Sequence, residues 1–210
     1  AEMVRDQALL ASGLLSTTMG GPPVMPPQPQ GVWNSVYNNA KWIDATGPNR
    51  YRRAIYTFIK RTSGYPSLLM FDASDRDTSL PRRIQTNTPL QALVTLNDPV
   101  YEEASEALAR RVMKEAGANT SGVSSADSIL DARLAYETRL VLSRDPTPQE
   151  MTVLRAFYKQ ALTMTKPPVL MKVSMQLPEQ SSGREVSSRE LDAFTSVGSV
   201  LLNLDAALVR

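Results

Sequence analysis

The chain has 210 residues and a net charge of +2 at pH 7; 42% of its residues are hydrophobic and 6% are aromatic. It contains no cysteine and no histidine, which excludes disulfides, Cys/His zinc sites, histidine-ligated haem, thiol nucleophiles and histidine-based acid–base catalysis within these residues. The mild charge and the low aromatic content give no support for nucleic-acid binding, so we expect no nucleic-acid partner.

No apolar run approaches the length of a membrane-spanning helix, and no signal peptide opens the sequence. We therefore expect no membrane span in this segment. The first residues already have a helical pattern, so we expect the chain to be a piece of a longer protein. In that case the missing leader says nothing about where the longer protein resides.

The first 31 residues combine a helix with a long irregular segment. Residues 1–15 have helical periodicity, with Met3, Leu10 and Leu14 on one face. Residues 16–31 are rich in Pro and Gly, above all in the Pro-rich part 20–31, and predict an extended loop. Such a loop can recognise a partner, or it can wrap over the core and pack on it; we favour packing.

Aromatic residues follow at near-helical spacing at Trp33, Tyr37 and Trp42. The pattern indicates a short helix whose aromatic side chains anchor the core. An aromatic platform that binds a sugar is the alternative.

Residues 50–61 hold five cations, and no acidic residue lies between Asp44 and Asp72. The apolar residues of this segment predict a short buried helix, with a strand as the alternative. These apolar residues are Ile55, Phe58 and Ile59. Because the cations alternate with core residues, we expect some arginines to lie near buried acids.

The nearest acids are Asp72, Asp75 and Asp77, and bridging between arginine and these carboxylates is the expected arrangement. The same loop could hold Ca²⁺, but it lacks the spacing, the glycine and the terminal glutamate of an EF-hand.

The stretch from Arg82 to Pro99 is the one around which the chain is organised. Thr88-Pro89 is a strong helix start, because a threonine can cap the first turn and proline is tolerated at the first helical position. An apolar stripe follows at Leu90, Leu93, Val94 and Leu96. Asp98-Pro99 repeats the start signal, so two helices should meet at a corner near Asn97.

Polar and cationic side chains surround this corner. Arg82, Arg83, Asn87 and Gln91 could form a pocket for an anion or a polar ligand, since the helix start favours negative charge. The alternative, which we weight more heavily, is that they tie a long loop to the helical core. We assign no catalytic residue and no metal ligand. The candidate ligand-binding residues are Arg52, Arg53, Arg76, Arg82, Arg83, Asn87, Gln91, Asp72 and Asp98.

The second half is plainly helical. Helices are predicted from Pro99 to Gly117, over 126–144, from a capping box at Thr147-Pro148-Gln149-Glu150, and over 189–210. The predicted fold is all-α: an irregular helical bundle with long Pro/Gly-rich loops in its N-terminal half. We expect a single domain over 1–210, loop-rich in 1–99 and helical in 100–210, with a mobile loop at 166–188.

Many short motifs in one order resemble a known family over essentially the whole chain. These motifs include Ala1-Glu2-Met3-Val4-Arg5-Asp6-Gln7, Gly20-Gly21-Pro22, Gly31-Val32-Trp33, Tyr51-Arg52-Arg53, Tyr56-Thr57-Phe58, Phe71-Asp72-Ala73, Thr86-Asn87-Thr88-Pro89-Leu90-Gln91-Ala92-Leu93, Leu96-Asn97-Asp98-Pro99 and Leu201-Leu202-Asn203-Leu204-Asp205. The family is the C-terminal domain of unknown function of large exported planctomycete-type proteins. The chain departs from the family pattern at Ile59, Ser79 and Phe194, where tryptophan, cysteine and tryptophan are usual.

The resemblance implies an exported protein, at the cell surface or in the periplasm, which often carries an N-terminal planctomycete cytochrome c domain. A haem would then lie in that domain, and we expect no cofactor in this one. The partners implied are other domains of the same chain, a neighbouring exported protein or an anionic glycan. The function that we favour is a non-catalytic binding or docking module. The alternative is part of an enzyme that acts on complex or sulfated polysaccharide, with an arginine-rich anion site and Asp72, Asp75 or Asp98 as acid or base.

Overall fold

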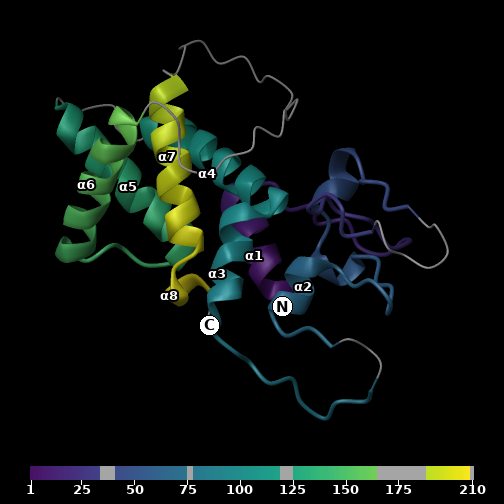
Figure 1. Ribbon diagram of the computed structural model, residues 1–210. Helices are drawn as coiled ribbons and strands as arrows, with labels where there is room; N and C mark the ends of the chain where they lie inside the picture. The colour runs from purple at the N-terminus through teal and green to yellow at the C-terminus, as the bar shows by residue number, and fades with distance from the viewer. Residues whose placement is uncertain (34–40, 75–77, 119–124, 165–187, 209–210) are drawn as a thin grey trace.

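A computed structural model describes residues 1–33, 41–74, 78–118, 125–164 and 188–208. The described residues form helices joined by long loops and contain no strand, only three isolated β-bridges. The predicted all-α fold is confirmed (Figure 1). The helices are α1 (Glu2–Ser12), α2 (Pro66–Met70), α3 (Pro89–Asn97), α4 (Pro99–Ala118), α5 (Ala126–Leu142), α6 (Pro148–Thr163), α7 (Ser188–Leu202) and α8 (Asp205–Leu208), with 3₁₀ turns at Gly47–Tyr51 and Ala54–Tyr56.

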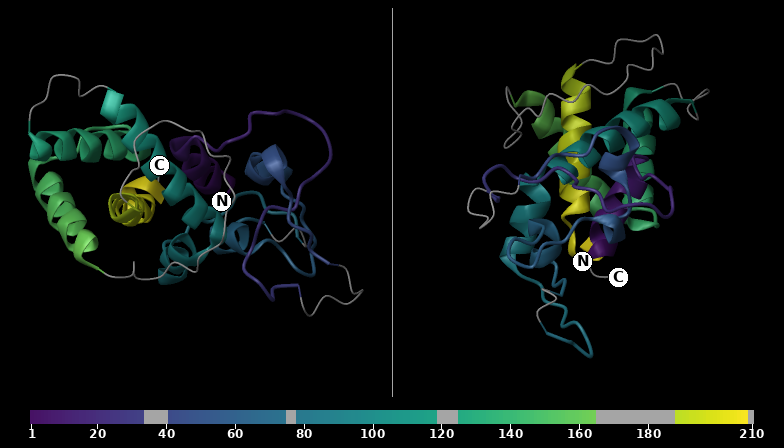
Figure 2. Two further views of the ribbon diagram at one scale, coloured as in Figure 1. Left: turned by 90° about the horizontal axis from the view of Figure 1, so that it is seen from above. Right: turned by 90° about the vertical axis from the view of Figure 1, so that its right-hand side faces the viewer.

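The long helix α4 lies at the centre, with α1 on one side and α5, α6 and α7 on the other (Figure 2). The side of α4 that faces the other helices is buried, at Tyr101, Ala104, Ser105, Leu108 and Val112. These residues pack with α5, α6 and α7 into one apolar core. The N-terminal loops lie beyond α1, on the side away from α6 (Figure 1).

Two helix starts form as their sequences predict. Thr88 and Gln91 make a reciprocal capping box on α3, and Thr147 and Glu150 make another on α6. In both cases proline occupies the first turn, where its missing N–H leaves no partner unsatisfied. The C-terminus of α1 ends at Gly13, whose φ of 79° is the left-handed conformation that glycine adopts without strain.

The Pro-rich loop packs on the protein, as expected. Arg52 is buried and donates from its guanidinium to the carbonyl oxygens of Thr18, Gly20 and Pro22. The Trp42 indole and the Tyr65 hydroxyl donate to the carbonyls of Pro26 and Pro27 over 2.8 and 2.7 Å. Since these carbonyls belong to a segment that lacks regular structure, side chains replace the hydrogen bonds that a helix would supply.

On α1, the residues that are exposed and those that are buried do not follow the apolar pattern of the sequence. Met3 and Leu10, which the periodicity places on one apolar face, are both exposed, and the buried residues of α1 include Arg5, Leu9 and Ser12. The reason is that the Arg5 guanidinium donates to the carbonyl oxygens of Arg52 and Arg50, at 2.6 and 3.0 Å. A polar residue can therefore face inward on α1, because the buried carbonyl groups of the loop backbone need a hydrogen-bond donor at this position.

Other local predictions are also corrected. The segment near Ile55 is not a buried helix: only Ala54–Tyr56 forms a 3₁₀ turn, Thr57 bridges to Val24, and Ile55 is exposed. The last helix is interrupted after Leu202, because Asn203 accepts a hydrogen bond from Thr95 of α3, at 2.6 Å. Of the predicted aromatic helix, residues 34–40 lie outside the described residues, while the Trp33 and Trp42 rings pack edge-on with centroids 5.1 Å apart. The predicted mobile loop also lies almost wholly outside them.

A buried glutamate lies inside the main core. Glu137 of α5 is fully buried, and neither of its carboxyl oxygens has a hydrogen-bond partner among the described residues. Burial raises the pKa of Glu137 well above its usual value, which favours the neutral form of the carboxyl. Helix α7 approaches so closely that a Cβ on Gly198 would lie 3.0 Å from Oε1.

We expect Glu137→Met to raise the free energy of unfolding by about 1–3 kcal/mol, because methionine has a similar length and removes the unsatisfied polar group. Urea unfolding at pH 7 measures the change. Glu137→Ala is the control and should destabilise, since it leaves a cavity. A methionine variant less stable than the wild type would mean that the carboxyl oxygens have a partner.

Candidate functional site

The candidate arginines are spread over the molecule. Arg53 pairs with Asp6 of α1 at 3.2 Å, and Arg83 makes a two-point contact with Glu2, at 2.7 and 3.1 Å. Arg52 lies under the Pro-rich loop, with its guanidinium 3.8 Å from the centroid of the Tyr56 ring. Arg82 is exposed and has no hydrogen bond or ion pair to another described residue. Arg76 lies outside the described residues.

Two arginines of the basic segment 50–61 pair with acids of α1 and α4, and not with Asp72 as expected. The carboxylate that pairs with Arg50 is Glu103 of α4, and the one that pairs with Arg53 is Asp6 of α1. Asp72 instead accepts hydrogen bonds from the backbone N–H and the hydroxyl of Thr86, at 2.7 and 2.9 Å. Asp75 and Asp77 lie outside the described residues. Helices distant in sequence therefore supply the counter-charges, which spacing along the chain does not reveal.

The polar residues before α3 fasten a loop to the helices. Gln91 is buried, donates to the Met70 carbonyl at 2.9 Å and accepts from the Thr88 N–H at 3.2 Å. Asn87 donates to Asp205 of α8 at 2.8 Å. The structure thus brings Asp72 and Gln91 to Thr86, but places Asn87 with α8 and Arg83 with α1.

Asp98 forms the corner between α3 and α4. It is buried, and its Oδ1 accepts from the Val100 N–H at 3.0 Å, while Oδ2 has no partner among the described residues. Burial raises the pKa of Asp98 to about 6, against the opposing effects of the Val100 N–H and the Arg5 cation. Burial likewise raises the pKa of Glu102, one turn into α4, to about 7. An enclosed cap of this kind supports the corner and is not exposed to a substrate.

Helix α3 turns two of its three leucines outward. Leu90 and Leu93 are 57% and 55% exposed, whereas the buried residues of this helix are Gln91 and Thr95. Ile84, in the loop that leads into α3, is 79% exposed. We call the side of the helix that carries Leu90 and Leu93 the α3 face. The periodicity of the sequence shows the apolar stripe but does not show that hydrogen bonds would hold the opposite, polar side of the helix inward.

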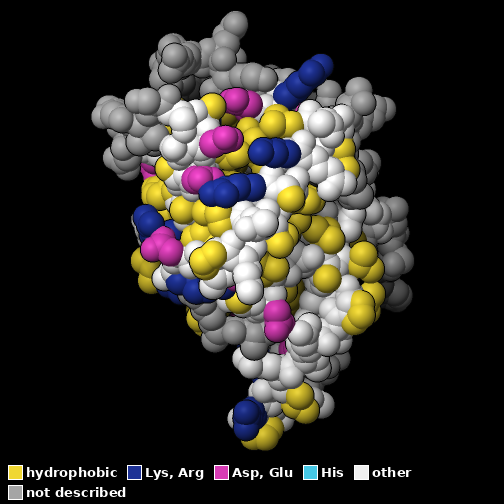
Figure 3. Space-filling view, turned by 90° about the vertical axis from the view of Figure 1, so that its left-hand side faces the viewer, with side chains coloured by type: hydrophobic (Ala, Val, Ile, Leu, Met, Phe, Trp, Pro, Cys, Tyr) yellow, Lys and Arg dark blue, Asp and Glu magenta, His cyan; other side chains and the backbone are white. Residues whose placement is uncertain are grey.

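The loop before α3 projects from the body of the protein. Residues 78–87, which we call the arm, are all exposed and extend below the helices in Figure 1. In the space-filling view the arm is the lowest part and shows both cationic and hydrophobic side chains (Figure 3). The face formed by α5 and α6 is different, because its cations pair with neighbouring acids, as Arg155 does with Asp131 and Arg144 with Glu150.

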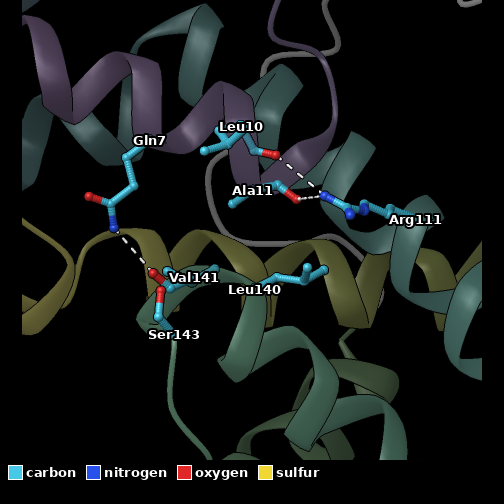
Figure 4. Close-up of a pocket in the computed structure, with 7 residues that line it drawn as sticks. All are labelled: Gln7, Leu10, Ala11, Arg111, Leu140, Val141 and Ser143. Atoms are coloured by element: carbon cyan, nitrogen blue, oxygen red, sulfur yellow. Dashed lines mark hydrogen bonds between the residues drawn. The ribbon is translucent and has the colours of Figure 1, made fainter.

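A second feature is a groove of about 430 Å³ between α1, α4 and α5 (Figure 4). Leu10, Ala11, Leu140 and Val141 supply most of its walls. Its polar groups bond to backbone. Gln7 donates to the Val141 carbonyl at 3.1 Å, and Arg111 donates to the carbonyls of Leu10 and Ala11 at 3.3 and 2.9 Å. These hydrogen bonds connect the ends of α1 and α5 to neighbouring helices. The groove therefore offers few free polar groups to a ligand.

No helix in the described part of the chain is both long and apolar enough to cross a membrane. The described residues also contain no group of three or more acidic side chains that could hold a metal ion.

Comparisons with known proteins give one family. No curated protein and no solved structure matches the chain. A family model described as "PSD1: Protein of unknown function (DUF1553)" matches residues 1–158, which include the arm, α3 and the Asp98 corner. Because that match covers 158 of the 210 residues, the chain belongs to the PSD1 (DUF1553) family.

Proposed function

We propose that this domain is a non-catalytic docking module of a large exported bacterial protein. Through the α3 face it binds another domain of the same polypeptide or a neighbouring exported protein. It carries no cofactor of its own, and any haem belongs to another domain of the longer chain. The observation that carries the proposal is the orientation of α3, with Leu90 and Leu93 outward and Gln91 and Thr95 inward.

The polar side of α3 has a complete set of partners, which accounts for its burial. Gln91 bonds to Met70 and Thr88, and Thr95 donates to Asn203. The leucines are 57% and 55% exposed, so burying each of them completely would add roughly half of the ~1.5–3 kcal/mol that a fully exposed leucine gains. Leu90 and Leu93 are three residues apart and so lie on the same side of α3, and an exposed apolar pair beside polar residues fits a site that another protein covers.

The distribution of arginines favours docking over an anion site for polysaccharide. Arg53 and Arg83 are neutralised by Asp6 and Glu2, and Arg52 is enclosed by loop carbonyls. A site for a sulfated chain needs several unpaired cations on one cleft. The described arginines are dispersed, so the polysaccharide function remains a prediction without support from this arrangement.

Because the chain contains no cysteine, a single introduced thiol reports the exposure of one position. We expect Leu93→Cys to react rapidly with a maleimide in the isolated domain and at least about tenfold more slowly in the longest native chain that carries the domain, or with the native neighbour present. The factor of ten corresponds to about 1.4 kcal/mol of protection.

The matched control is Val153→Cys on α6, a position that is 67% exposed. Its labelling rate should be the same in the isolated domain and in the longer chain. Equal labelling rates at positions 93 and 153 in every native context would overturn the docking function.

A further inference from the structure

We propose that the arm is a processing site, at which an arginine-specific endopeptidase hydrolyses the peptide bond between Arg82 and Arg83 and converts the domain into a two-chain form. The proposal goes beyond the docking function and does not depend on it, because it concerns the arm and not the α3 face. Two observations carry it together: the backbone of the arm is open to a protease, and the residues on both sides of the bond are fastened to the helices.

The backbone of the arm is accessible. Every residue from 78 to 87 is exposed and lies outside the helices, and none forms a backbone–backbone hydrogen bond within the described part of the chain. The arm extends below the helices (Figure 1). The rate of proteolysis follows the population of conformations in which the segment to be cut is open. In the arm no helix has to unfold before a protease can bind.

Arg82 provides the side chain that an arginine-specific protease recognises. Proteases of the trypsin type bind this side chain in a pocket that contains an acid. Arg82 has no hydrogen bond or ion pair to another described residue, so its guanidinium is available. Arg83 is engaged by Glu2 at 2.7 and 3.1 Å, and breaking an exposed ion pair of this kind slows cleavage after Arg83 by up to about fivefold. The bond after Arg82 is therefore the preferred one.

Exposed arginines elsewhere lie in segments that are held in place. Arg53 pairs with Asp6, and the same carboxylate accepts from the N–H of Ala54 at 2.7 Å, so both sides of the bond after Arg53 are fixed. Arg61 lies in a tight turn that a backbone hydrogen bond across residues 60–63 closes, at 3.1 Å. A protease has to open these contacts first, which it does not have to do at Arg82.

The reaction is a simple hydrolysis. The bond between the Arg82 carbonyl carbon and the Arg83 nitrogen breaks, and one water is consumed. Arg82 gains a terminal carboxylate, and Arg83 gains a terminal ammonium group.

The two fragments should stay together after the cut. Thr86, on the C-terminal side, remains bound to Asp72 at 2.7 and 2.9 Å. Helix α1 lies against α4 (Figure 2) and contributes Ala8 and Ala11 to the main core. Gln91 also donates to the Met70 carbonyl across the cut, at 2.9 Å. Cleavage therefore changes the covalent chain without releasing either part.

The first measurement is a time course of trypsin cleavage of the whole chain, with the new ends read by mass spectrometry. We expect the end that begins at Arg83 to form at least about tenfold faster than the ends at Ala54 and Thr62, whose bonds require local opening. The fragments should elute together in gel filtration and separate in urea. Comparable initial rates at the three bonds, or fragments that separate without urea, would overturn the proposal.

Variants identify the arginine that is recognised. Arg82→Gln should move the cut to the bond after Arg83, with a rate up to about fivefold lower than that of the wild type at Arg82. The matched control is Arg61→Gln, which removes an exposed arginine outside the arm and should leave the rate at Arg82 unchanged.

The deciding readout is the protein isolated from the cells that make it. We expect a polypeptide that begins at Arg83, and its absence from Arg82→Gln/Arg83→Gln. A wild-type chain that is uncut in the arm would overturn the processing site, even if trypsin cuts the arm in vitro. A cut in the arm that persists in the double variant would overturn the role of the arginines.

Discussion

Replacing Arg5 with alanine is expected to lower the free energy of unfolding by about 3–6 kcal/mol, because it removes two hydrogen bonds from a buried charged donor, each of which contributes about 1.5–3 kcal/mol. Arg5 is 1% exposed, and its guanidinium donates to the carbonyl oxygens of Arg52 and Arg50 at 2.6 and 3.0 Å. The substitution leaves both carbonyls without their donor and opens a cavity between α1 and the loop-rich half. Denaturant unfolding at pH 7 measures the loss.

The same substitution should loosen the N-terminal loops before it affects the main core. Ser16 donates its N–H to the Tyr51 carbonyl at 2.9 Å, and Val24 donates to the Tyr56 carbonyl at 2.8 Å. Both acceptors lie in the segment that Arg5 holds. We expect faster hydrogen exchange at these two amides. Arg53→Ala removes only a half-exposed ion pair to Asp6 and should cost no more than about 1 kcal/mol. A similar cost for both variants would show that Arg5 has no special role.

Replacing Asp98 with asparagine is expected to stabilise the protein at high pH and to leave its stability almost unchanged near pH 4. Burial raises the pKa of Asp98 from 3.8 to about 6 in the folded protein. Between these two values the folded state binds more protons than the unfolded state, so wild-type stability falls as pH rises through this window. A shift of about 2 units corresponds to about 3 kcal/mol, which sets the upper limit of the gain at pH 8.

Asparagine keeps an oxygen that can accept from the Val100 N–H, so it preserves the cap and removes only the charge. Asp98→Ala removes the cap as well and should be about 1 kcal/mol less stable than the asparagine variant at every pH. Urea unfolding from pH 4 to pH 8 gives the profiles. The asparagine variant should retain a smaller step near pH 7 from Glu102, whose raised pKa has burial as its first cause and the Asp98 charge as its second. Identical profiles for wild type and Asp98→Asn would contradict the expected ionisation.

The prediction of the helical half depended on features that act locally. The capping boxes at Thr88 and Thr147 contain their own hydrogen-bond partners within four residues, and the buried stripe on α4, from Tyr101 to Val112, repeats over about three turns. Such signals survive in any tertiary context, which is why the all-α fold and these helix starts were predictable. The end of α7 was not, because Asn203 is held by Thr95 from a helix about 100 residues earlier.

In the candidate site, too, the features set by neighbouring residues were predictable and the long-range contacts were not. The sequence identified the corner at Asp98 and the polar residues before α3, since proline and capping residues mark them directly. It could not assign partners to the arginines, because Asp6 and Glu103 come from helices far from the basic segment. Charge patterns along the chain show how many cations need compensation but not which acids provide it.

Local sequence signals were enough to predict the fold class, the starts of the principal helices and the chemistries that a chain without cysteine and histidine excludes. Long-range contacts set which faces of α1 and α3 turn inward. Both helices bury polar side chains, Arg5 in one and Gln91 and Thr95 in the other, because irregular loops and a broken helix end present backbone and side-chain groups that need hydrogen bonds. Leu10, Leu90 and Leu93 consequently face outward, and periodicity, which is the same for either orientation, does not reveal that choice.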